Sequence, residues 1–333
     1  MGAMTAPIVH IGFHKTATSW FQTAVYPRVT SHRFVHRELV RSVFMDSDAF
    51  HFDPAEARQR LDADGDLRPP LICEEDLSGV LHIGAASTYI AKEVARRIHA
   101  TMPDAHIAIF VREQVDAAAS WYLQYLKEGG TASAHRYLFP DEYIYPGRLM
   151  LFKTARFNFS QLDYAGLIQA YDELFGREQV HVFAYEQLRE DSAAFLSHMR
   201  QSLGFTLAGG EIPSDRVNQA YRRGLVPVAR AMNHFTGRQV ANKRTLLHLP
   251  FWFRTRREIL DRLNAVPLLG RRPSARTLLN TSERQWIRER FASSNAWLSE
   301  RMGCDLAALG YSVGEHELAP APQRTRLLRW SRK

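Results

Sequence analysis

The chain has 333 residues, of which 45% are apolar and 11% aromatic, enough to build the core of one large domain or two smaller ones. Its longest apolar runs have only the length of a strand, so the sequence predicts neither a transmembrane span nor a secretory signal. Two cysteines are too few for a disulfide framework or a cysteine-based metal site, and we expect both as buried thiols in a reducing, cytoplasmic compartment.

The formal net charge of +8 is unevenly distributed along the chain. Residues 217–257 contain nine arginines and lysines and no acidic residue, and a second basic cluster occupies residues 324–333. Such segments indicate either a solvated basic surface or a contact with an anionic acceptor, an anionic membrane or nucleic acid. Charge alone leaves these alternatives open.

The first predicted element is a short apolar strand over residues 7–12, which leads through a loop into a helix. This arrangement favours anion binding, because the free N–H groups and the positive end of the helix dipole point into the loop. Lys15 adds a mobile positive charge. Three hydroxyl side chains add short donors for phosphate-type oxygens: Thr16, Thr18 and Ser19. The loop is not a Walker A loop, because His14 precedes the lysine and Val9 stands where the first glycine would be.

Three carboxylates, Glu74, Glu75 and Asp76, directly follow a buried strand predicted over residues 67–73. In an open parallel sheet, ligands bind at the carboxyl ends of the strands. One of these side chains is therefore a candidate general base, although a carboxylate here can also simply cap the next helix. His82 is a competing base a few residues later.

A helix is predicted over residues 87–102, where apolar residues recur at helical spacing and the basic residues, Arg97 among them, are expected to face outward. The next strand, over 105–111, ends at Arg112, and Ser120 follows two turns into another helix. An arginine can hold a phosphate with two hydrogen bonds and a serine can add a further donor. Arg112 and Ser120 therefore form a candidate phosphate site, with a surface ion pair as the alternative for Arg112.

The segment 127–160 is irregular and rich in aromatic residues, which predicts a lid or a substrate-binding loop, or alternatively a loop packed on the core. Beyond it, helices are predicted over 162–175 and 191–203, on either side of a buried strand over 180–183. A long helix with an N-cap signature is predicted over 281–302.

Three of these stretches resemble motifs of the sulfotransferases that use 3′-phosphoadenosine 5′-phosphosulfate (PAPS). The string Gly12 to Gln22 is similar to their 5′-phosphosulfate loop, especially the bacterial form Gly-x-x-Lys-Thr-Gly-Thr-Thr-x-x-Gln. Ala17 replaces the usual glycine of that form, so we expect that the backbone there does not need a positive φ. Arg112 and Ser120 resemble the 3′-phosphate motif, and Glu75-Asp76-Leu77 resembles the turn that carries the general base.

The resemblance implies an α/β, P-loop-like three-layer fold with a central parallel sheet flanked by helices. It implies one sulfotransferase domain over residues 4–318, including a basic segment 217–276, and a basic tail over 319–333. The implied reaction moves a sulfonate group from PAPS to a hydroxyl of a carbohydrate, glycolipid or small metabolite, releases PAP and requires no metal. The implied nucleotide-binding residues are His14, Lys15, Thr16, Ala17, Thr18, Ser19, Trp20, Arg112 and Ser120. The implied catalytic residues are Lys15 and the base Glu75, with Glu74 and His82 in reserve.

Two other functional classes fit the same residues. One is a nucleotide kinase or hydrolase with an atypical loop, and the other is a non-catalytic protein that binds an anionic polymer through its basic segment. The expected partner of a sulfotransferase is a small-molecule or glycan acceptor, which can be anionic, and no nucleic acid. Residues 324–333 would form a basic amphipathic helix, which is typical of weak membrane contact, although a disordered tail is the alternative.

Overall fold

A computed structural model describes residues 6–140, 156–210, 212, 220–237, 240 and 245–323. The basic cluster 324–333 and part of the segment 127–160 therefore lie outside the described residues. No helix in these ranges is both long and apolar enough to cross a membrane.

Five parallel strands form the central sheet, in the order β2-β3-β1-β4-β5. The strands are β1 (Ile8–Gly12), β2 (Arg33–Phe34), β3 (Pro70–Cys73), β4 (His106–Val111) and β5 (Val180–Ala184). β1 lies in the middle, where Ile8 pairs with Leu71 of β3 and with His106 of β4. All residues of β1 and β3 are buried, as expected for parallel strands that are covered on both faces.

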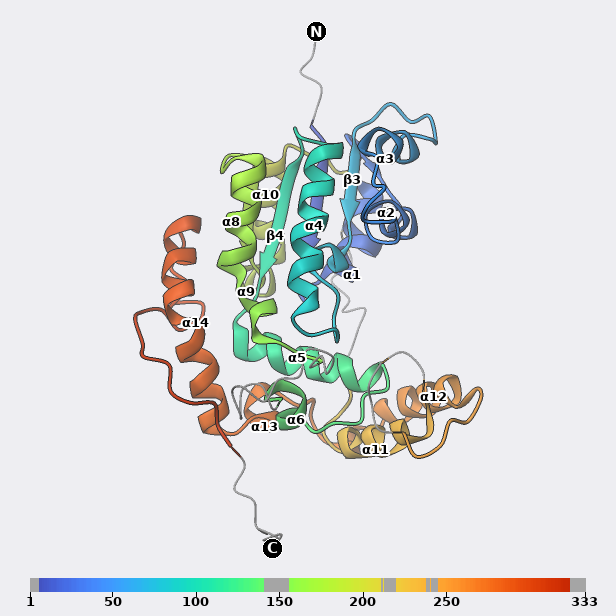
Figure 1. The fold of residues 1–333 in the computed structure, drawn as a ribbon, viewed down its shortest axis with the longest axis vertical. Helices are drawn as coiled ribbons and strands as arrows, with labels where there is room; N and C mark the ends of the chain where they lie inside the picture. The colour runs from blue at the N-terminus through green and yellow to red at the C-terminus, as the bar shows by residue number, and fades with distance from the viewer. Residues whose placement is uncertain are drawn as a thin grey trace, which may run out of the picture.

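Helices cover both faces of the sheet and complete a three-layer arrangement (Figure 1). Val9 and Ile107 face one core cluster, and Ile8 and Phe110 face another, because alternate residues of a strand point to opposite faces. The helices of the first cluster include α2 (Arg37–Phe44), α3 (Pro54–Leu61), α4 (Ala86–Thr101), α8 (Tyr164–Phe175) and α14 (Thr281–Met302). The second cluster includes α10 (Ser192–Leu203) and the helical turns α1 (Thr18–Trp20), η1 (Phe21–Val25) and η2 (Tyr26–Arg28). The predicted fold class is confirmed.

Side-chain caps account for two of the helix starts. The Asp53 carboxylate accepts a hydrogen bond from the Ala55 amide at 2.8 Å, and Pro54 fits the first turn of α3 because its missing N–H needs no partner there. At α14, Asn280 and Glu283 each accept a hydrogen bond from the other's backbone amide at 2.8 Å. The predicted bounds of this last helix are confirmed.

Arg97 of α4 is buried, so the expectation that it faces outward was wrong. Its guanidinium donates hydrogen bonds to the Phe44 carbonyl oxygen at 3.1 Å and to the Ser47 hydroxyl at 2.9 Å. Both acceptors lie at or just after the end of α2, which packs on this side of α4. Helical periodicity could not reveal this contact, because it depends on how two separate helices pack.

The described part of the segment 127–160 belongs to the core. It contains a short helix, α6 (Ala134–Leu138). Its described aromatic side chains, Tyr137, Phe139, Phe157 and Phe159, are at most 2% exposed and pack against one another in tilted or edge-on contacts. Residues 141–155, where the remainder of the predicted lid falls, lie outside the described residues.

Most of the described part of the basic segment is helical, and its residues 220–237 and 245–272 are called here the α11–α12 unit. Its main helices are α11 (Leu225–Met232) and α12 (Trp252–Asn264), which share a small apolar core of their own. Figure 1 shows both helices beyond α5 (Gln114–Lys127), on the side away from the sheet. The fully buried Arg256 joins the unit to α5, because its guanidinium donates to the carbonyl oxygens of Leu126 at 3.3 Å and Lys127 at 2.7 Å.

Candidate active site

A cavity of about 710 Å³ lies at the carboxyl edge of the sheet, where the loops after β1, β3 and β4 meet. The chain leaves β1 toward β2 and β3 but leaves β4 toward β5, so the edge between β1 and β4 is the switch point at which open α/β sheets bind ligands. The predicted site residues that line the cavity are His14, Lys15, Ala17, Thr18, Ser19, Trp20, Glu75, Arg112 and Ser120. Thr16, Glu74 and His82 are not part of its lining.

The loop after β1 turns sharply through residues with a left-handed backbone. Gly12 has φ +87°, and a Cβ placed there would lie 3.2 Å from the Cα and Cβ of Glu75. Lys15 and Ala17 have φ values of +66° and +73°. The expectation for Ala17 was therefore wrong, and each non-glycine residue in this conformation costs about 1 kcal/mol. The turn is held by a hydrogen bond from the Thr16 hydroxyl to the Phe13 carbonyl oxygen, so Thr16 supports the loop.

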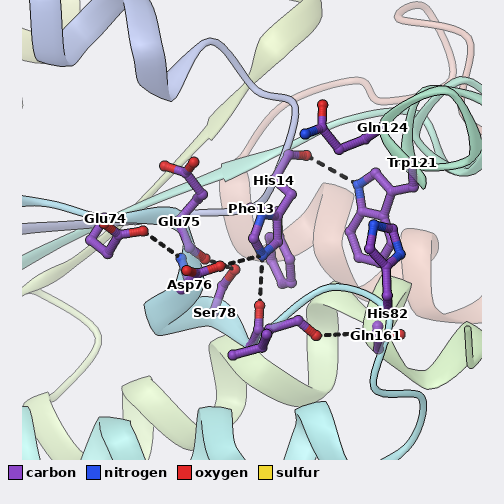
Figure 2. A network of polar contacts seen from close by, with 12 residues as sticks. Phe13, His14, Glu74, Glu75, Asp76, Ser78, His82, Trp121, Gln124 and Gln161 are labelled. Carbon is purple, nitrogen blue, oxygen red and sulfur yellow. Dashed lines mark hydrogen bonds and ion pairs between the residues drawn. The ribbon is translucent and has the colours of Figure 1, made fainter. Parts of the chain in front are cut away.

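His14 fastens the loop to the turn that follows β3. Its Nε2 donates a 2.6 Å hydrogen bond to the Gly79 carbonyl oxygen and lies 3.6 Å from the Asp76 carboxylate. The Trp121 indole N–H donates to the His14 carbonyl oxygen at 3.2 Å. Figure 2 shows His14 between Asp76, in the turn after β3, and Trp121, in α5. The position of Lys15, the next residue, is consequently fixed from several sides.

Lys15 is the mobile cation predicted for the loop, and it is half-buried beside the cavity. Its Nζ donates to Gln124 Oε1 at 3.4 Å. Burial lowers the pKa of Lys15 to about 8. The charged neighbours are Lys127 and Arg112, which lower this pKa further, and Glu75 and Glu128, which raise it. The site therefore holds a cation whose charge is incompletely balanced, which is the condition for attracting an anion.

Thr18, at the start of the helical turn, offers a donor to the cavity. Its hydroxyl oxygen is buried and has no hydrogen-bond partner among the described residues. Burying a polar group without a partner costs about 1–3 kcal/mol. An anion in the loop would remove this cost, because the Thr18 hydroxyl could donate to one of its oxygens.

Arg112 brings the second predicted anion site to the same cavity. Its Nη1 donates to the Lys15 carbonyl oxygen at 3.1 Å, and its guanidinium lies 4.9 Å from the centre of the Tyr185 ring. The Tyr164 hydroxyl donates to the Arg112 carbonyl oxygen at 2.7 Å and so fixes the backbone after β4. Ser120 lines the cavity from α5. The loop after β1 and the pair Arg112–Ser120, which are far apart in the sequence, thus face one space.

The adjacent carboxylates Glu74 and Glu75 have different environments. Glu74 is fully buried and binds Arg37 through both oxygens, at 2.9 and 3.0 Å, while it also caps the turn η3 (Glu75–Ser78). Burial, followed by the charge of Glu75, raises the pKa of Glu74 against the opposing effect of Arg37. Glu75 lines the cavity, and its Oε2 has no hydrogen-bond partner among the described residues. Figure 2 shows Glu75 projecting away from the contact between Glu74 and Asp76.

His82 is buried behind the cavity wall, with both ring nitrogens close to other side chains. Its Nδ1 lies 2.9 Å from the Tyr137 hydroxyl and its Nε2 lies 3.0 Å from a carboxylate oxygen of Glu128. Burial raises the pKa of Glu128, but the hydrogen bonds with His82 and Gln124 and the charges of His82 and His14 together leave this pKa lowered. Glu128 also accepts a 2.7 Å hydrogen bond from Gln124, the residue that contacts Lys15. His82 therefore supports the wall next to the lysine.

Several residues that line the cavity were not predicted. They are Arg37, Arg41, Val80, Leu81, Gln124, Glu128, Tyr185, Leu188, Arg189 and Ser192. Two of them could have been predicted from their spacing. Gln124 and Glu128 follow Ser120 at intervals of four residues, which places all three on one face of α5. Arg37 and Arg41 have the same spacing on α2, but nothing in the sequence indicates that this helix borders the cavity.

Comparison with known proteins gives only distant similarities. No protein-family model matches the chain, and no curated protein matches it. Among solved structures, a sulfotransferase from Alicyclobacillus acidocaldarius is 18% identical with a TM-score of 0.45, covering 66% of this chain and 87% of that one. Mouse sulfotransferase SULT7A1, complexed with PAP, is 12% identical with a TM-score of 0.33, covering 78% of this chain and 84% of that one. These similarities are too distant to assign the chain to a family, so a proposal for its function rests on the site.

Proposed function

We propose that the protein transfers a sulfonate group from PAPS to an acceptor hydroxyl. The observation that carries this proposal is that three stretches line one cavity: the loop of residues 14–19, the pair Arg112 and Ser120, and Glu75. Each stretch meets one requirement of the reaction, namely a site for the phosphosulfate, a site for the 3′-phosphate and an acceptor for a proton.

The residues of the cavity fit a nucleotide with two separate anionic groups. Lys15 and the unpartnered Thr18 hydroxyl would hold the 5′-phosphosulfate. Arg112 and Ser120 would hold the 3′-phosphate, the group that distinguishes PAPS from simpler nucleotides. Trp20 lines the cavity and offers an aromatic face on which the adenine can stack.

The chemistry requires two of these side chains. Glu75 takes the proton from the acceptor hydroxyl as the oxygen forms its bond to sulfur, while the bond between sulfur and the bridging phosphate oxygen breaks. The proton moves to the carboxylate of Glu75, a residue that lines the cavity and whose Oε1 lies 3.7 Å from the Arg37 guanidinium. Lys15 stabilises the negative charge that develops on the departing phosphate oxygen. A half-buried ammonium group is effective in this role because little water screens it.

Nucleotide selectivity tests the proposal directly. We expect PAP and PAPS, without magnesium, to raise the melting temperature at lower concentrations than ATP with magnesium does, because a ligand stabilises the native state that binds it. Thermal-shift titration measures this order. A larger shift with ATP and magnesium would instead favour a kinase or hydrolase. Salt-sensitive retention on heparin without any response to PAP would favour a binder of anionic polymers.

Arg112→Ala should weaken PAP binding by about 1.5–3 kcal/mol, the usual loss for a hydrogen bond to a charged group. Adenosine 5′-phosphosulfate, which lacks the 3′-phosphate, serves as the matched ligand and should bind both proteins almost equally. Arg112→Lys should show an intermediate loss, because lysine keeps the charge but lacks the two-pronged geometry. Isothermal titration calorimetry measures the affinity of the wild-type protein and of both variants for each of the two nucleotides. Equal losses for the two nucleotides would mean that Arg112 holds the loop through the Lys15 carbonyl instead of binding the 3′-phosphate.

A further inference from the structure

Exposed apolar side chains are concentrated on the α11–α12 unit. Of the fifteen large hydrophobic side chains that are exposed in the described residues, ten lie between residues 228 and 268. Leu246 is 77% exposed, Phe251 75% and Leu268 95%. Scattered single residues of this kind are ordinary, but such a concentration marks an interaction surface.

The loop before α12 is fixed in place with its apolar side chains outside. The amides of Leu246 and Leu249 donate to the carbonyl oxygens of His234, at 2.8 Å, and Phe235, at 3.1 Å. Phe251 then adopts φ +66°, an unfavourable conformation for a bulky residue, at the position that precedes α12. The loop is thus tied down through its backbone, while the apolar side chains remain in contact with solvent. Holding apolar side chains rigidly in water is unfavourable, so we expect a binding partner to cover them.

α12 adds a second set of exposed apolar residues. Its inward side carries the buried Arg256 and Leu260. Ile259 and Leu263 lie one turn apart on an adjacent stripe, and Val266 follows just beyond the end of the helix; each of the three is at least 37% exposed. The outward side of an ordinary surface helix is polar, so this stripe departs from the usual pattern.

The charge of the same region favours an anionic partner. Residues 245–272 contain six arginines and two acidic residues, one of which, Asp261, lies 3.7 Å from Arg257. Arg254 and Arg262 are exposed between the apolar side chains. A second copy of this chain would set the same arginines against one another, and nucleic acid would leave the leucines and Phe251 in water. Arginines interleaved with leucine, isoleucine and phenylalanine match the boundary between lipid headgroups and acyl chains.

We infer that residues 246–251 and the exposed stripe of α12, together with Leu268, form a docking surface for an anionic lipid bilayer. The apolar side chains enter the headgroup region, and the arginines contact lipid phosphates. Arg256 fixes α12 to the end of α5, the helix that also carries cavity residues such as Ser120. If the proposed sulfotransferase function holds, docking would hold the enzyme beside lipid headgroups. The acceptor would then be a hydroxyl of a glycolipid headgroup.

Vesicle co-sedimentation of the full chain tests the docking surface without any nucleotide. The protein should bind vesicles of phosphatidylglycerol and phosphatidylcholine, but bind pure phosphatidylcholine weakly, at physiological salt. The double variant Leu246→Ser with Phe251→Asn should lose at least roughly tenfold in binding, because asparagine accepts the left-handed backbone but does not enter the bilayer. Leu268→Ser alone, in an exposed turn, should also weaken binding. Phe50→Ser with Leu67→Ser, at 94% and 99% exposed positions outside the unit, is the matched control and should bind normally.

The outcomes distinguish lipid docking by this surface from self-association and from membrane contact by the C-terminal tail. Unchanged binding of both the Leu246/Phe251 and the Leu268 variants would overturn the inference, as would loss of binding only on truncation after residue 323. A dimer in solution that these substitutions dissociate, without vesicle binding, would assign the surface to a second copy and also overturn it. Because sedimentation needs no nucleotide, vesicle binding without PAP binding would reject the proposed reaction and leave the docking surface standing.

Discussion

Lys15→Ala is expected to lower the rate of sulfonate transfer at least roughly a hundredfold and to weaken PAP binding as well. The ammonium group is half-buried beside the cavity, where its charge is poorly screened. Without it, the charge on the departing phosphate oxygen would be stabilised only by hydroxyl and amide donors. Single-turnover kinetics with radiolabelled PAPS measure the rate, and calorimetry with PAP measures the binding. Weaker PAP binding with an unchanged rate would mean that Lys15 only holds the nucleotide.

The pH dependence of the same reaction provides a second signature of Lys15. Its pKa of about 8 in the free protein means that the charged form is lost as the pH rises past 8. We expect kcat/KM for PAPS to fall in that range, because this parameter reports groups of the free enzyme. In Lys15→Arg the charge persists, so the alkaline fall should disappear even if the rate is lower. The same fall in Lys15→Arg would assign it to another group.

Glu75→Gln should also lower turnover at least roughly a hundredfold, because the amide cannot accept the proton of the acceptor hydroxyl. PAP binding should not weaken, since glutamine has the same shape and removes a negative charge from a cavity that binds an anion. Steady-state rates and PAP calorimetry on the same preparation separate these effects. Glu74→Gln is the matched control: its side chain binds Arg37 and does not line the cavity. Glu74→Gln should lower the melting temperature, because it weakens a buried ion pair, and should lower turnover much less than Glu75→Gln does.

His82→Ala decides between the two candidate bases. Both ring nitrogens of His82 are within 3.0 Å of other groups, the Tyr137 hydroxyl and the Glu128 carboxylate, so neither faces the cavity. We therefore expect a moderate loss of rate, through displacement of Glu128 and Gln124 next to Lys15. An active Glu75→Gln together with an inactive His82→Ala would transfer the role of base to His82.

The sequence predicted those features that depend on neighbouring residues in the chain. Nearly continuous apolar runs located four of the five strands, β1, β3, β4 and β5, because strands covered on both faces carry few polar residues. The strand β2, with only two residues, carries no such pattern. Arg112 and Ser120 could be predicted to lie together at the carboxyl edge of the sheet, because Arg112 follows a strand and Ser120 lies two turns into the next helix.

Other features depend on packing between distant segments and could not be predicted. Ala17 has a left-handed backbone, although alanine normally avoids it, at the position where the loop enters α1. Arg37 and Arg41 reach the cavity only because α2 packs beside the turn after β3. The aromatic residues around Tyr137, predicted to contact a substrate, instead fill the core.

The position of β1 in the sheet has a consequence for how the protein is made. β1 is the first strand of the sheet, yet Ile8 pairs only with Leu71 and His106, which the ribosome adds much later. Parallel pairing over such separations closes long loops and is slow. The loop of Lys15 is thus translated early but becomes ordered only after Arg112 has left the ribosome. Until then an apolar strand remains uncovered on the nascent chain, and during that interval the protein is most exposed to aggregation.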